Sequence, residues 1–228
     1  MSPTFTATEA GEHRITADLS ASPSEAAVDA VALQADIPLD PGHGGRSIPP
    51  DALEPGDVIF STTNERISAV IRRVSGPGPV SHARIYIGKV ANEPMVVEAV
   101  SSGVQKAFLG EIIKKDNLAV AFRMRGMTSA QRSNLMNFLE SELDKPYDHW
   151  GVIGYPFKRF VYKDKPASVN FENTNPKGYF CSQLVEEAFK RTGMPIFTTT
   201  AYPPSPNDLA SLTFIPDKIE YVGHLKTP

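Results

Sequence analysis

The sequence predicts an α+β domain in which an antiparallel β-sheet packs against amphipathic helices. Three consecutive segments between residues 82 and 125 are rich in β-branched and aromatic residues and are separated by Asn, Gly or Asp. Before and after this run, apolar residues recur at the spacing of one helix face, starting near Ile67, Leu135 and Leu184. Consecutive strands joined by short turns pair antiparallel, so we expect a meander covered by helices.

The chain divides into a polar extension and one main domain. Its 228 residues with 41% hydrophobic content can bury a substantial core. Residues 1–50 are rich in Ser, Thr, Ala, Pro, Gly and Asp, which is typical of a flexible connector, with one short helix expected from Ser24 to Leu33. We therefore expect a flexible extension at 1–50 and one main domain at 51–228.

Composition argues against several classes of function. The formal net charge of -3 gives no broad electrostatic reason to bind nucleic acid or an anionic membrane. A single cysteine allows no intramolecular disulfide and no thiolate cluster that could hold a structural zinc or an iron–sulfur centre. No stretch of about 18 apolar residues occurs, and the N-terminus lacks a signal-peptide pattern. The expected location is soluble and cytoplasmic, or secreted without a cleavable signal.

The elements expected in the domain alternate between short strands and helices. A first helix, in ERISAVIRRVSG, carries apolar residues at i, i+3, i+4 and i+7 from Ile67 and ends at Gly76. The clearest helix, TSAQRSNLMNFLESELDK, begins with Thr128 and Gln131 in capping-box spacing. Strands are expected within residues 53–63, 82–90, 94–109, 118–125 and 219–225, helices within 65–76, 128–145 and 181–190, and a long loop within 144–178.

Cys181, in GYFCSQLVEEAF, is open to two interpretations. Gly178 interrupts the preceding chain, which places the thiol in or just before the first turn of a helix, where the helix dipole favours a thiolate. However, Cys181, Leu184, Val185 and Ala188 also follow the spacing of an apolar face, so the residue can equally belong to the core.

A catalytic thiol needs a base, and His82 is the best placed of the five histidines. His82 stands at the head of the strand SHARIYIG, where sheet structure would hold it rigidly. His13 and His43 lie in the extension, His149 lies in a loop, and His224 is close to the C-terminus.

Glu98 is the single carboxylate in the apolar run PMVVEAV. Such a group either faces solvent or is paired inside, because an unpaired buried charge is costly. If the two segments are neighbouring antiparallel strands, Glu98 can lie across from His82 and hydrogen-bond to it.

The order of these motifs resembles the circularly permuted branch of the NlpC/P60 papain-like superfamily. That branch includes the YiiX- and YaeF-like hydrolases and is related to the lecithin-retinol acyltransferase group. The resemblance covers roughly residues 50–215, and His82 precedes Cys181 as the permuted order requires. It rests on the joint order of PGDVIFS, SHARIYIG, VVEAV, KPYD, YFCSQLVEEAF and PSPNDLA.

The resemblance implies a permuted papain-like fold and a site for thiol chemistry. Cys181 would be the nucleophile, His82 the general base and acid, and Glu98 the residue that orients His82. Tyr147, in KPYD, would line the cleft and bind substrate. Arg84 departs from the family pattern, which has an uncharged residue there, and is expected to meet an acidic group of a substrate or a surface partner.

The implied reaction is hydrolysis of an amide bond through an acyl-enzyme, without metal or cofactor. The first substrate expected is a peptidoglycan-type peptide in a bacterium. One alternative is a lipid acyltransferase or phospholipase, for which the aromatic and basic segment at 151–163 would be an interfacial lip or an ordinary loop. A second alternative is an inactive interaction domain. Expected partners are a peptide or lipid-like acyl substrate and, for export without a signal, a secretion-system or immunity protein.

Overall fold

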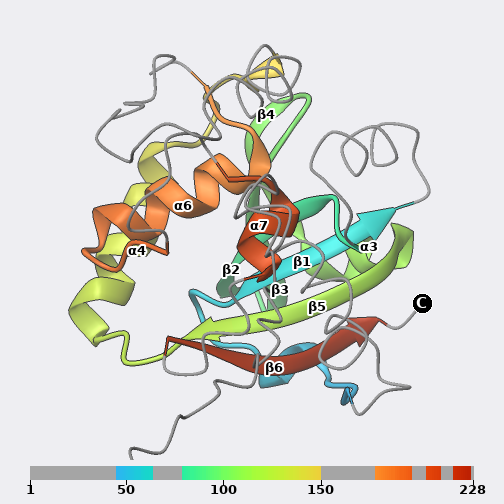
Figure 1. Cartoon of the computed structure of the whole chain (residues 1–228). Coiled ribbons are helices and arrows are strands. Elements are labelled where there is room, and N and C mark those ends of the chain that lie inside the picture. Colours follow the sequence, from blue (N-terminus) through green and yellow to red (C-terminus); the bar gives the residue numbers. More distant parts are fainter. Residues whose placement is uncertain (1–44, 64–78, 150–177, 197–203, 212–217, 227–228) are drawn as a thin grey trace, which may run out of the picture.

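A six-stranded antiparallel sheet forms the centre of the computed structural model (Figure 1). The structure describes residues 45–63, 79–149, 178–196, 204–211 and 218–226. Across the sheet the strands run in the order β4-β3-β2-β1-β5-β6. Their bounds are Val58–Thr63 for β1, His82–Val90 for β2, Glu93–Val100 for β3, Gly103–Phe108 for β4, Asp116–Met124 for β5 and Ile219–Lys226 for β6.

Helices connect and cover these strands. The expected helices in 128–145 and 181–190 are confirmed, and the capping box at Thr128 and Gln131 forms as predicted. The segments expected to be helical at 24–33 and 65–76, and the aromatic and basic segment at 151–163, lie outside the described residues. The helices are η2, a 3-10 turn at Pro50–Ala52, α3 at Leu109–Lys115, α4 at Ser129–Ser141, α6 at Cys181–Arg191 and α7 at Pro206–Ser211.

The expected meander is confirmed for β2, β3 and β4 but not for the last of the three segments. The segment 94–109 contains two strands, which the turn before Gly103 separates. The segment 118–125 was expected beside them, yet β5 pairs with β1, with Val58 opposite Phe122. The reason is α3, which follows β4 directly and packs against β3, β4 and β5. It carries the chain across the sheet to the other side of β1.

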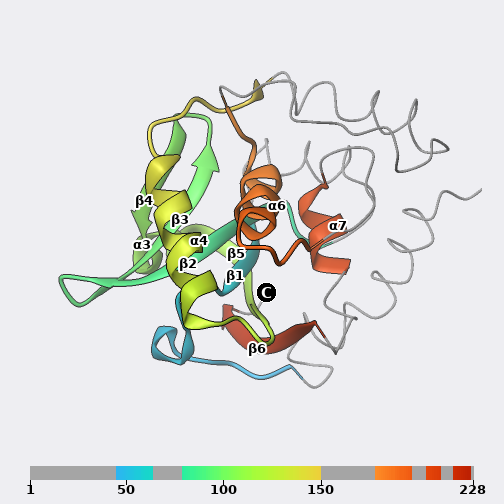
Figure 2. The same cartoon turned by 90° about the vertical axis from the view of Figure 1, so that its left-hand side faces the viewer.

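Two apolar clusters lie on the sheet. The larger one joins strand residues such as Val58 and Ile85 to Leu135 of α4 and Leu184 of α6. The smaller one joins Ile59, Tyr86 and Val96 to Leu109 of α3. Alternate residues of β1, such as Val58 and Ile59, thus enter different clusters, as the two-residue repeat of a strand requires. Figures 1 and 2 show α6 and α7 on one side of the sheet.

The folded part includes residues that the sequence assigned to the extension. The backbone of residues 46–48 runs beside β6, where Ile48 N donates to His224 O at 2.8 Å and His224 N donates to Arg46 O at 2.7 Å. Gly223 permits this approach, because a Cβ there would lie 2.5 Å from Ile48 Cγ2. The segment before residue 51 therefore covers the edge of β6.

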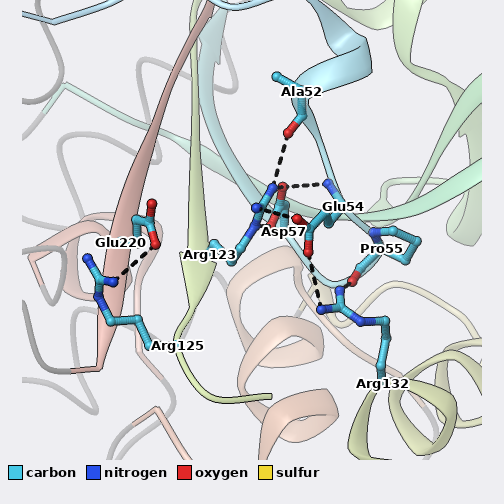
Figure 3. Close-up of polar contacts among 8 residues, drawn as sticks. All are labelled: Ala52, Glu54, Pro55, Asp57, Arg123, Arg125, Arg132 and Glu220. Atoms are coloured by element: carbon cyan, nitrogen blue, oxygen red, sulfur yellow. Dashed lines mark hydrogen bonds and ion pairs between the residues drawn. The ribbon is translucent and has the colours of Figure 1, made fainter. Parts of the chain in front are cut away.

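A network of charged groups fixes the turn that leads into β1 (Figure 3). Asp57 is fully buried, and its two carboxylate oxygens accept from Arg123 of β5 at 2.7 and 2.8 Å. Glu54 lies between Arg123 and Arg132 of α4, and Arg132 also donates to Pro55 O. These contacts join the entry to β1 with β5 and α4.

Candidate active site

Cys181 is the first residue of α6 and is 3% exposed. Leu184, Val185 and Ala188 follow it into the larger apolar cluster, so the predicted apolar face is confirmed. The structure therefore shows both expected positions of Cys181, the apolar core and the first turn of a helix. Its position is buried, and it also lies in the first helical turn, where the backbone N–H of Ser182 donates to its sulfur.

The chain just before Cys181 is held by a close backbone contact. Tyr179 N donates to Pro146 O at 3.2 Å, and Asp148 N donates to Tyr179 O at 3.1 Å. A Cβ on Gly178 would lie 2.4 Å from Pro146 O, a distance that no side chain tolerates. Glycine at 178 therefore lets the cysteine helix start beside the KPYD segment.

His82 begins β2, where only one neighbouring strand pairs with it. Its partner on β1 is Ser61, whereas the β2–β3 ladder ends at Ile85 and Val97. The backbone N–H of Ala83 is thus available to donate to the sulfur of Cys181. The start of α6 lies against the part of β2 that does not pair with β3.

The side chains of Cys181, His82 and Glu98 form one hydrogen-bonded chain. His82 Nε2 lies 2.9 Å from Glu98 Oε2, and the exposed fractions of the two side chains are 16% and 7%. The imidazole also hydrogen-bonds to Cys181. Since Glu98 occupies Nε2, Nδ1 is the ring nitrogen left for the sulfur. Gln105 Nε2 donates to the second carboxylate oxygen of Glu98 at 3.4 Å.

The electrostatics of this chain favour a thiolate and an imidazolium. Burial opposes both charges, but each charge stabilises the other. The pKa of His82 is raised to about 9 by Cys181 and Glu98 against the effects of burial and of Arg84. The pKa of Cys181 is lowered, because the charge and hydrogen bond of His82 outweigh its burial. Burial likewise opposes ionised Glu98, yet His82, Arg84 and Gln105 lower its pKa to about 2.

Arg84 has partners inside the protein instead of the expected substrate or surface partner. Its side chain is 3% exposed, since it lies on β2 between the neighbouring strands. Arg84 Nη1 donates to Asp116 Oδ2 at 2.7 Å, and Nη2 donates to Ser61 Oγ at 2.9 Å. Arg84 Nε lies 3.4 Å from Glu98 Oε2.

Tyr147 lies near the sulfur, on the segment that pairs with Tyr179. Burial and the negative charges of Cys181 and Asp148 raise the pKa of Tyr147, so its hydroxyl keeps its proton at neutral pH. Its ring packs edge-on against His149, with the ring centroids 4.9 Å apart.

The segment at 204–208 holds both halves of the site in place. Val80 N, two residues before His82, donates to Asn207 Oδ1 at 3.2 Å. Ser182 Oγ, one residue after Cys181, donates to Pro204 O at 2.6 Å. Sequence reasoning gave these residues no individual role. The spacing of Ser205 and Asp208, which cap each other at the start of α7, was the available signal.

Two of the remaining histidines, His149 and His224, lie within the described residues. His149 is exposed, and His224 is buried with its Nδ1 2.6 Å from Tyr221 Oη. His13 and His43 lie outside the described residues. Within the described ranges, no group of three His, Cys, Asp or Glu side chains is arranged to hold a metal ion. In the same ranges, no helix has the length and apolar character needed to cross a membrane.

Comparison with known proteins shows what this chain is similar to. In fold, the crystal structure of metalloprotein yiiX from Escherichia coli O157:H7 matches with a TM-score of 0.47 and 20% identity, over 77% of this chain and 89% of that chain. In sequence, the probable lipoprotein peptidase YaeF of Escherichia coli (strain K12) is 28% identical over 200 residues, which cover 76% of this chain and 71% of the relative. The model of the permuted papain-like amidase enzymes, the YaeF/YiiX or C92 family, matches residues 52–153. Over residues 52–153 the chain is therefore similar to the permuted papain-like amidase family, and this similarity indicates a cysteine hydrolase of the peptidase/amidase type.

Proposed function

We propose that the protein hydrolyses an amide bond with Cys181 as nucleophile, His82 as general acid and base, and Glu98 as the residue that orients His82. The observation that supports it is the hydrogen-bonded chain from Cys181 through His82 to Glu98. An activated thiol requires a base within hydrogen-bond reach and a group that fixes the base, and this chain supplies both.

The first half of the reaction starts from the thiolate and the imidazolium. The sulfur of Cys181 attacks the amide carbonyl carbon, and the carbonyl electron pair moves to oxygen. The tetrahedral intermediate collapses as the C–N bond breaks, and His82 gives its proton to the departing nitrogen. The products of this half are a free amine and a thioester on Cys181.

The second half returns the enzyme to its starting state. Neutral His82 takes a proton from water, and the hydroxide attacks the thioester carbonyl. The C–S bond breaks, which releases a carboxylic acid and leaves the thiolate beside the imidazolium. Glu98 stays ionised throughout, because its pKa lies near 2.

The start of α6 supplies the donors for the oxyanion of each intermediate. The backbone N–H of Cys181 lies in the first turn, where helix N–H groups lack partners within the helix. Tyr147 lines the same place with a phenol that stays protonated, and we assign it to substrate binding. The previously expected role of Arg84 in substrate binding receives no support, because Asp116, Ser61 and Glu98 occupy its guanidinium.

We further propose a peptide substrate of the peptidoglycan stem type. The support is the peptidase activity named for the YaeF relative and the amidase activity named for the family. The lipid alternative draws on no described residue, and a secretion-system or immunity partner stays a prediction from the sequence.

The test incubates the full chain with peptidoglycan stem-peptide fragments and, separately, with phospholipid vesicles. We expect new amine and carboxylic acid termini from the peptides, and an acyl group on Cys181 when the reaction is quenched early. Cys181→Ala and His82→Ala should abolish both signals. Release of fatty acid from vesicles without peptide cleavage would overturn the substrate class.

An electrophilic thiol probe separates an active enzyme from an inactive interaction domain. Iodoacetamide should label Cys181 of the native protein much faster than Cys181 of the His82→Ala variant at pH 7. Equal and slow labelling of the two proteins would contradict an activated thiol.

A further inference from the structure

A buried guanidinium stands next to the proposed triad without belonging to it. Arg84 is 3% exposed, and Asp116 on β5 is 1% exposed. Their contact at 2.7 Å joins the two strands on either side of β1. A buried arginine is costly unless it is paired, and here Asp116 and Ser61 accept hydrogen bonds from Nη1 and Nη2 while Nε forms an ion pair with Glu98 without a hydrogen bond.

The guanidinium of Arg84 lies closer to the carboxylate of Asp116 than to that of Glu98. Its short bond goes to Asp116, at 2.7 Å, whereas Glu98 Oε2 lies 3.4 Å from Nε. That same oxygen of Glu98 lies 2.9 Å from His82. Asp116 and Ser61 thus fix the guanidinium, and its Nε attracts the oxygen of Glu98 that also faces His82.

We propose that Arg84, anchored by Asp116 and Ser61, is a positioning residue that keeps the Glu98 carboxylate turned toward His82. The inference rests on the proposed triad and adds two residues to its support. Arg84 acts through Glu98 and touches neither the substrate nor the sulfur. Arg84 thereby serves the chemistry from inside the sheet.

The charged groups around the imidazole determine what a loss of Arg84 does. His82 faces Cys181 of α6, Glu98 of β3 and Arg84 of its own strand, and Glu98 also faces Gln105 of β4. The charge of Arg84 lowers the pKa of His82, so loss of this charge alone would raise that pKa. Without Arg84, however, Glu98 turns away from His82, and the imidazolium loses the carboxylate that raises its pKa. We expect this second effect to be the larger one. An imidazole with a lower pKa carries less positive charge at a given pH. It therefore stabilises the thiolate less, and the pKa of Cys181 rises.

The variant that tests this removes both charges together. Arg84→Met with Asp116→Leu leaves neither of these two charges buried without its partner, and such replacements of an ion pair are often tolerated by the fold. The matched control is Lys89→Met with Asp51→Leu, which removes an ion pair of 2.8 Å at the exposed end of the same strand.

The readout is the rate of alkylation of Cys181 by iodoacetamide as a function of pH. We expect the midpoint of the double variant to rise by about one unit, so that the rate below it falls about tenfold. The low-field Nε2–H proton resonance of His82 should also exchange faster with water. The control pair should change neither.

Each outcome separates this inference from the proposed function. If the midpoint stays or falls while His82→Ala abolishes fast alkylation, the triad stands and the role of Arg84 is overturned. If His82→Ala alkylates as fast as the native protein, the proposed function itself fails. If the double variant does not fold, Arg84→Lys decides, because it keeps the charge but loses the fork that binds Asp116 and Ser61. An unchanged midpoint in Arg84→Lys overturns the inference, and a raised one supports it.

Discussion

Glu98 meets His82 along a diagonal of the sheet, with 2.9 Å between its Oε2 and the imidazole Nε2. The β2–β3 ladder pairs Ile85 with Val97, so the next positions along the two strands are Arg84 and Glu98. His82 therefore lies two residues beyond the position opposite Glu98. Diagonal neighbours on one face are within reach of long side chains, and Arg84 occupies the position directly opposite Glu98.

The substitution Glu98→Gln tests what this contact does for the reaction. Glutamine keeps the shape of the side chain but removes the charge that helps to raise the pKa of His82 to about 9. We expect the pKa of His82 to fall and the rate of amide hydrolysis to drop about 100-fold, because His82 is then less well oriented and less basic.

The measurement is kcat on the cleaved peptide, together with an NMR titration of His82. Glu93→Gln, at the exposed start of the same strand, is the matched control and should retain full activity. Full activity in Glu98→Gln would show that His82 needs no carboxylate.

The native enzyme should show a bell-shaped dependence of activity on pH. On the acid side, activity appears as Cys181 ionises, and the lowered pKa of Cys181 places this limb below that of a free thiol. On the alkaline side, activity is lost as pH rises through about 9, where His82 loses the proton needed by the leaving amine.

The check is kcat/KM on the peptide from pH 4 to 11, with alkylation of Cys181 measured in parallel. Glu98→Gln should move the alkaline limb to lower pH, because Glu98 raises the pKa of His82. An alkaline limb that stays fixed in this variant would assign that limb to another group.

The residues of the proposed triad each carry a local signal in the sequence. Enrichment in β-branched and aromatic residues placed His82 and Glu98 on strands, and a short turn made those strands neighbours. Gly178 indicated the start of the helix at Cys181. Such signals arise from residues that are close together in the sequence.

The surroundings of the triad depend on contacts that are distant in sequence. Arg84 was expected to meet an acidic group of a substrate or a surface partner, because its actual partner, Asp116, is 32 residues away and reaches it only through the position of β5. That position in turn follows from α3, a helix of seven residues with no strong capping signal. The attachment of Arg46 to β6 spans 175 residues or more and leaves no local pattern.

Gly178→Ala should disturb the site without touching a catalytic group. The new Cβ would lie 2.4 Å from Pro146 O, so the two backbone segments must move apart. We expect a loss of about 1–3 kcal/mol in the free energy of unfolding, the usual effect of overpacking. Since these segments position Tyr147 and Cys181, alkylation of the thiol should also become slower.

Gly110→Ala is the matched control, because nothing lies within 4 Å of its added Cβ in α3. There alanine should be neutral or slightly stabilising, as its helix propensity exceeds that of glycine. Thermal unfolding and iodoacetamide kinetics of both variants check the contrast. Equal behaviour of the two variants would refute the role of the close approach at Gly178.

Asp57→Ala should weaken the fold at the entry to β1. Asp57 is fully buried and accepts from both Arg123 Nε and Nη2 and from Glu54 N, so its loss leaves three donors without their acceptor. We expect the free energy of unfolding to fall by about 3 kcal/mol, at the lower end for a broken buried pair, because Arg123 is 22% exposed. For a chain of this length that corresponds to a melting temperature lower by roughly 6–12 °C. Glu111→Gln breaks an exposed pair with Lys114 and should leave the melting temperature unchanged. Similar melting temperatures for the two variants would mean that β5 and α4 do not depend on Asp57 for their attachment to β1.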